Sequence, residues 1–158
     1  MSWCSERNLI STDKSSLYLS SSISLLAIFA SLSLETTNAS FYKCVSENSE
    51  SRNLRSVFKR LAKIEREHAD IVRKYLDLEP IEFAEEKCSL VDQENIIKAR
   101  ETIIKTIEFY KNASNEAREP KINGLFRAIG GAEENCLELL DSITGKKYSN
   151  EIPLFVSK

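Results

Sequence analysis

The chain has 158 residues, enough for one domain with a substantial core, and its formal charge of −2 gives no electrostatic reason to expect a nucleic-acid partner. Only 4 glycines and 3 prolines occur, which favours long helices joined by few turns. The four cysteines form no CxxC motif, and this excludes a four-cysteine zinc or iron site. Isolated cysteines are typical of reduced cytoplasmic thiols, although Cys4, Cys44, Cys88 and Cys136 could also form two disulfides.

The first predicted element is a helix from about Asp13 to Val45, capped by Thr12 or Asp13. Its segment Leu17–Leu34 carries no charge over 18 residues, which is just long enough to suggest a membrane span or a signal peptide. Serines dilute this segment, charges lie close to both ends, and no good cleavage site follows it. We therefore expect a cytoplasmic protein in which this segment is buried in a helix bundle or in a dimer contact.

Three further helices are predicted at about Arg52–Leu78, Gln93–Ala117 and Pro120–Thr144. Asp92 is a candidate cap for the middle one, and Gly145 for the end of the last. Short links join the helices within each half of the chain, whereas a long acidic segment joins the two halves. This order predicts an all-α four-helix bundle, residues 1–145, made of two antiparallel hairpins and followed by a tail, residues 146–158.

The second half of the chain repeats the first after a shift of 68 residues without a gap. The shared positions are an aromatic pair with its lysine, a phenylalanine and a glutamate: Phe41-Tyr42-Lys43 matches Phe109-Tyr110-Lys111, Phe58 matches Phe126, and Glu65 matches Glu133. A common register for these residue types is unexpected from helical periodicity alone. The two hairpins should therefore be related by a pseudo-twofold axis.

Polar side chains interrupt the apolar stripes of three helices at one level. Glu65 and His68 continue the stripe of the second helix, Glu133 and Cys136 continue that of the fourth, and Glu35 lies on the inner face of the first. Ionised glutamates in an apolar interior are costly and repel one another, and a cation would remove both costs. Carboxylate and imidazole ligands suit iron, manganese or zinc.

The Glu65-Arg66-Glu67-His68 motif on a core stripe, with Glu35 seven residues before Tyr42, resembles the rubrerythrin branch of the ferritin-like superfamily over roughly residues 30–143. The resemblance implies a ferritin-like bundle with a dinuclear non-haem centre, iron being the first choice. It further implies that Glu65 and Glu133 bridge two metals, with Glu35 and His68 as terminal ligands of one of them.

The chain departs from this pattern at the second metal. Ile103 occupies the expected glutamate position and Cys136 the expected histidine position. Because no CxxC motif occurs, we also expect no rubredoxin-like electron-entry domain. Glu101 and Glu108 point away from position 103 on a helix and cannot replace it. We therefore predict at most one tightly bound ion, held by Glu35, Glu65, His68 and Glu133.

Plainer roles remain open for each candidate. His68 could be a hydrogen-bonded core histidine. Cys136 could be a small apolar residue or a ligand for a softer ion. Tyr42 and Tyr110 could be core aromatic residues or hydrogen-bond donors to the carboxylates. Arg100 could neutralise a carboxylate or extend to solvent.

Three functions follow. The first is an oxidoreductase acting on peroxide or dioxygen, served by an electron-donor protein. The second is a metal-binding protein without turnover, and the third is a metal-free interaction bundle, for example a homodimer.

Overall fold

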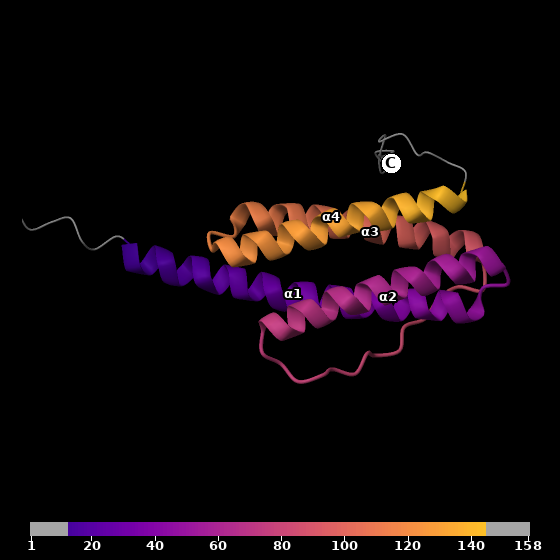
Figure 1. Ribbon diagram of the computed structural model, residues 1–158, viewed down its shortest axis with the longest axis horizontal. Coiled ribbons are helices and arrows are strands. Elements are labelled where there is room, and N and C mark those ends of the chain that lie inside the picture. The colour runs from indigo at the N-terminus through magenta and orange to yellow at the C-terminus, as the bar shows by residue number, and fades with distance from the viewer. Residues whose placement is uncertain (1–12, 145–158) are drawn as a thin grey trace, which may run out of the picture.

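A computed structural model describes the backbone of residues 13–144 and the side chains of residues 24–144. Four helices and no strand occur in this part of the chain (Figure 1). They are α1 (Asp13–Asn48), α2 (Arg52–Tyr75), α3 (Asp92–Glu116) and α4 (Pro120–Thr144). The predicted tail, the candidate caps Thr12 and Gly145, and Cys4 lie outside the described residues. The all-α prediction is confirmed.

The helices form two hairpins that lie against each other. α1 packs along α2 and α3 along α4, while α1–α3 and α2–α4 contacts join the hairpins. Residues 76–91, the linker, run along the outer side of the α1/α2 hairpin from the end of α2 to the start of α3 (Figure 1). The short links within each hairpin require antiparallel neighbours, and the long linker allows the second hairpin to start at the opposite end.

Several helix boundaries differ from the prediction by one to three residues, and α1, for example, ends at Asn48 instead of Val45. α2 ends at Tyr75 instead of Leu78, because Asp77 adopts a left-handed conformation with φ 53° and Arg73 donates a hydrogen bond to the Leu78 carbonyl. Asp92 is the first residue of α3 and not its cap, since Val91 occupies the N-cap position without a side-chain hydrogen bond. At the start of α2, Ser51 accepts a hydrogen bond from the Leu54 amide, which caps this helix.

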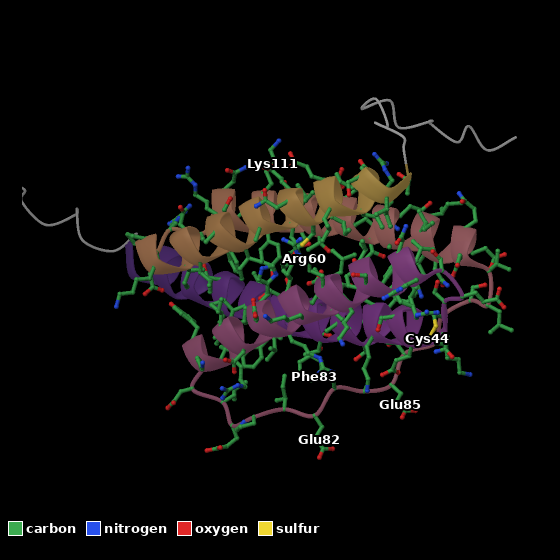
Figure 2. The ribbon with its side chains drawn as sticks, turned by 45° about the vertical axis from the view of Figure 1, so that its right-hand side comes forward. Cys44, Arg60, Glu82, Phe83, Glu85 and Lys111 are labelled. Carbon is green, nitrogen blue, oxygen red and sulfur yellow. A yellow bond between two sulfur atoms is a disulfide. The ribbon has the colours of Figure 1, made fainter. Side chains whose placement is uncertain are left out.

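The linker is attached to α1 by a disulfide between Cys44 and Cys88. Phe83 of the linker also turns toward the helices, where Arg66 of α2 lies 5.1 Å from its ring centre, whereas Glu82 and Glu85 point outward (Figure 2). The prediction of reduced thiols is therefore wrong for Cys44 and Cys88. Among the described residues Cys136 is the free cysteine, and it is buried.

The repeat found in the sequence reappears in the packing of the aromatic side chains. Tyr42 lies 5.8 Å from Phe58 with an interplanar angle of 57°, and its repeat equivalent Tyr110 lies 5.9 Å from Phe126 at 49°. Asn38 donates to Thr106 across 3.4 Å, although these residues are themselves 68 positions apart. Two equivalent residues that touch each other lie on the axis that relates the hairpins. The packing thus supports the predicted pseudo-twofold relation.

The apolar interior is divided into two clusters, one toward each end of the bundle. One contains Tyr42, Phe58, Leu61, Ile103, Cys136 and Leu140, and the other contains Ile28, Leu32, Val72, Tyr110, Phe126 and Ile129. In each of α1, α2 and α4 the predicted glutamate position falls between the residues of the two clusters. The polar site therefore lies at the middle level of the bundle.

The uncharged segment Leu17–Leu34 forms part of α1. Ile28 and Leu32 are buried, whereas Leu25, Leu26 and Phe29 are 49%, 69% and 48% exposed. None of the described helices combines the length and the apolarity that a bilayer span needs. Residues 24–34 of the segment are thus only partly covered by the bundle.

Candidate metal centre

Four predicted ligand side chains meet at the middle of the bundle. Glu35 comes from α1, Glu65 and His68 from α2, and Glu133 from α4, and one ligand atom of each lies within 4.8 Å of all the others. The Nδ1 atom of His68 is 3.0 Å from Glu133 Oε1, 3.3 Å from Glu35 Oε2 and 3.9 Å from Glu65 Oε2. The three glutamates are fully buried and His68 is 6% exposed.

Most polar atoms of this cluster have no hydrogen-bond partner. They are Glu35 Oε2, both oxygens of Glu65, both oxygens of Glu133, and His68 Nδ1. Buried polar atoms are almost always hydrogen-bonded in proteins, and a buried atom left without a partner costs about 1–3 kcal/mol, more when it is charged. Six such atoms around one point indicate a missing positive partner.

The mutual electrostatics of the four groups lead to the same conclusion. Burial raises the pKa of Glu65 well above its usual range, and the neighbouring carboxylates of Glu35 and Glu133 raise it further. Burial also acts to raise the pKa of Glu35, but Glu65 and His68 outweigh this effect and hold it below its usual value. Burial acts to lower the pKa of His68, whereas the carboxylates of Glu133 and Glu35 raise it to about 9. In the absence of a metal ion, the raised pKa values of Glu65 and His68 keep protons in the cluster, and these protons offset part of its negative charge.

A tyrosine supports one side of the cluster only. The Tyr110 hydroxyl of α3 donates a hydrogen bond to Glu35 Oε1, which orients this carboxylate toward His68. Its repeat equivalent Tyr42 is also fully buried, but its hydroxyl has no hydrogen-bond partner. The difference follows from the sequence, because the position equivalent to Glu35 is Ile103, and this side chain cannot accept a hydrogen bond.

The other half of a dinuclear centre is apolar. Ile103 is 0% and Cys136 1% exposed, and both belong to the cluster of apolar side chains around Tyr42. Burial raises the pKa of the Cys136 thiol to about 12, with a contribution from Glu133, so the thiol stays protonated in the absence of a metal. Glu101 and Glu108 are exposed, which confirms that they do not replace the missing carboxylate.

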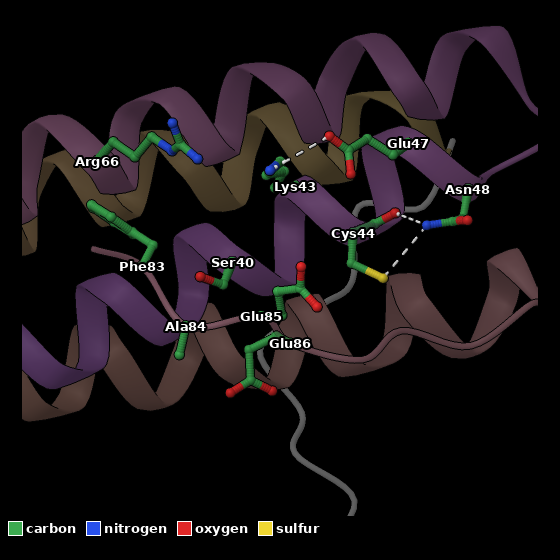
Figure 3. Close-up of a pocket in the computed structure, with 10 residues that line it drawn as sticks. All are labelled: Ser40, Lys43, Cys44, Glu47, Asn48, Arg66, Phe83, Ala84, Glu85 and Glu86. Atoms are coloured by element: carbon green, nitrogen blue, oxygen red, sulfur yellow. Dashed lines mark hydrogen bonds and ion pairs between the residues drawn. The ribbon is translucent and has the colours of Figure 1, made fainter.

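Arg100 and a surface pocket both lie away from the cluster. Arg100 Nε contacts Asp141 Oδ1 at 3.2 Å, an ion pair between α3 and α4. A surface pocket of about 260 Å³ lies between α1, α2 and the linker, beside the disulfide (Figure 3). Its charged lining residues have both signs, for example Lys43 and Glu47, which form an ion pair at 3.8 Å.

The match with a known family agrees with this geometry. The family model for rubrerythrin matches residues 27–143, which include all four cluster residues. The chain belongs to the rubrerythrin family. No curated protein and no solved structure matches it. The rubredoxin-like domain of full rubrerythrins is absent from residues 13–144.

The residues present fit one metal ion. Ligand bonds of about 2.0–2.2 Å place opposite ligand atoms no more than about 4.4 Å apart, so the cluster, at 4.8 Å, would contract by only a few tenths of an ångström. Three carboxylates and one imidazole are ligands that iron, manganese and zinc accept. The unpartnered atoms of the cluster are the same atoms that would bind such an ion.

Proposed function

We propose that this protein is a rubrerythrin-type, non-haem metal protein that holds a single transition-metal ion, iron being the first candidate and zinc or manganese the alternatives. The ligands would be Glu35, Glu65, His68 and Glu133. The observation that carries this proposal is the convergence of these four buried side chains, with six polar atoms lacking hydrogen-bond partners, on one point.

The number of ligands supports one ion instead of two. The four side chains supply one complete ligand set, whereas the remaining half offers only Ile103 and a protonated Cys136. A hard divalent ion needs several oxygen or nitrogen ligands, and an isoleucine and a thiol cannot supply them. Cys136 would become a ligand only for a softer ion, such as zinc, that displaces its proton.

The proposed reaction is the reduction of peroxide or dioxygen. A redox-active iron, when bound, would supply the electron chemistry. The chain's own residues would fix the ligand geometry through the Tyr110–Glu35 hydrogen bond and exclude bulk water by the two apolar clusters. Electrons would come from a separate donor protein, and the exposed side chains of Leu25, Leu26 and Phe29 would suit contact with a second copy in a homodimer.

The test is the metal content of the purified protein and of two variants. His68→Ala should lose most of the bound metal, because no other imidazole exists in the chain. Glu108→Gln, which changes an exposed carboxylate of α3, should bind as much metal as the unaltered protein. Peroxide consumption by the iron-loaded protein with a reductant then separates an oxidoreductase from a metal-binding protein without turnover.

A protein that takes up no iron, zinc or manganese under any loading condition would contradict the proposal. That result would favour the metal-free interaction bundle.

A further inference from the structure

Tyr42 is the repeat equivalent of Tyr110, but its hydroxyl lacks the carboxylate partner that the Tyr110 hydroxyl has. Both tyrosines lie on inner faces at corresponding positions, and each packs against the corresponding phenylalanine at nearly the same distance. Tyr110 donates to the Glu35 carboxylate. The Tyr42 hydroxyl, in contrast, is buried without any hydrogen-bond partner, because Ile103 occupies the position of the lost carboxylate.

An unpartnered buried hydroxyl is costly, so its persistence requires an explanation. A phenylalanine would fill the same space between Phe41 and Phe58 without an orphaned donor. The hydroxyl also belongs to the polar site and not to a remote part of the core. The charges of Glu65 and Glu133 and the thiol of Cys136 all act on Tyr42, after burial, to raise its pKa well above the usual value.

We propose that the Tyr42 hydroxyl is the hydrogen-bond donor for a small exogenous ligand, a water or a small anion, that enters the centre on the side of Ile103 and Cys136. Tyr110 donates its hydrogen bond to a glutamate of the protein, whereas Tyr42 would donate its hydrogen bond to the incoming molecule. The lost second ligand set thus provides a binding position for a small molecule. Tyr42 is in this respect a specificity-determining residue, and the inference rests on the metal-binding function proposed above.

Two chemical features define what this position would bind. The tyrosine supplies a single O–H donor, and the surrounding side chains, Phe58, Leu61 and Ile103, are apolar and fully buried. The metal ion of the centre would offset the charge of a small anion at this position, and a hydrogen bond to a charged acceptor is stronger than one to a neutral acceptor. Azide is a suitable probe of this class, because it is small, anionic and easily followed by absorption and infrared spectroscopy.

The test is a titration of the iron-loaded protein with sodium azide, together with the matched variants Tyr42→Phe and Tyr110→Phe. Metal per chain is measured first for each protein. Tyr42→Phe should keep its metal but bind azide about tenfold more weakly, the factor expected when one hydrogen bond to an anion is lost, and the infrared band of bound azide should shift. Tyr110→Phe should bind metal more weakly, whereas its metal-loaded fraction should bind azide as the unaltered protein does.

The variant Ile103→Glu keeps the Tyr42 donor and supplies an acceptor for it inside the protein. It places a carboxylate where Tyr42 can donate to it, as Tyr110 donates to Glu35, and this internal acceptor should prevent azide binding.

Two results would overturn the inference while leaving the proposed function intact: azide that does not bind to the metal-loaded protein, or azide that binds equally to Tyr42→Phe. Absence of metal from the unaltered protein would instead contradict both the proposed function and this inference.

Discussion

The metal-free protein should lose stability as the pH rises from about 6 to about 10, and His68 should cause most of this loss. Burial acts to lower the pKa of this imidazole, but Glu133 and Glu35 raise it from 6.5 to about 9. Because the pKa is raised in the folded state, the contribution of His68 is fully present below pH 6.5. It disappears as the pH rises through 9.

The magnitude follows from the two pKa values. The difference between about 9 in the folded chain and 6.5 in the unfolded chain corresponds to a loss of about 3 kcal/mol, at about 1.4 kcal/mol per pH unit. The raised pKa of Glu65 acts in the same direction, but its effect begins near pH 4.5 and is common to all variants that keep this residue.

The assay is urea unfolding, followed by helical circular dichroism, in the presence of a chelator at several pH values. His68→Gln is the matched variant, because it keeps a polar side chain but cannot be protonated in this range. The unaltered protein should lose about 3 kcal/mol more than the variant between pH 6 and pH 10. Parallel profiles for the two proteins would refute the argument that a protonated His68 replaces a cation in the cluster.

Three further predictions follow from single features of the structure. Ile103→Glu combined with Cys136→His should raise the metal content from one ion toward two, as measured by elemental analysis; a content still at one would show that more than these ligands is missing. Removal of the Cys44–Cys88 disulfide by two serine substitutions should lower the free energy of unfolding by up to about 4 kcal/mol, because the bond spans 44 residues. An unchanged urea midpoint would contradict this. Gly131→Ala should stabilise α4 by about 1 kcal/mol, because a Cβ atom there meets nothing within 4 Å, and a lower melting temperature would argue against it.

The fold and the cluster could be predicted because both depend on local, periodic features. The scarcity of glycine and proline indicated long helices, and the gapless repeat indicated two equivalent hairpins. Glu35, Glu65 and Glu133 were identifiable because each interrupts an apolar stripe at one level. The structure brings these three side chains and His68 together.

The remaining features depend on parts of the chain without periodicity. The Cys44–Cys88 disulfide joins a helix to an irregular linker whose path no pattern in the sequence indicates. The end of α2 depends on the left-handed conformation of Asp77, which the helical pattern through Leu78 does not reveal. The sequence placed Tyr42 and Tyr110 at the site, but only the atomic positions distinguish the tyrosine with a partner from the one without.

The most direct test of the central claim is the metal content of the protein purified without added metal and then loaded with iron, combined with anomalous X-ray scattering to place the ion. We predict one ion per chain, surrounded by Glu35, Glu65, His68 and Glu133. Two ions per chain, or one ion located elsewhere, would contradict the single-site account, and no bound metal at all would contradict the proposed function.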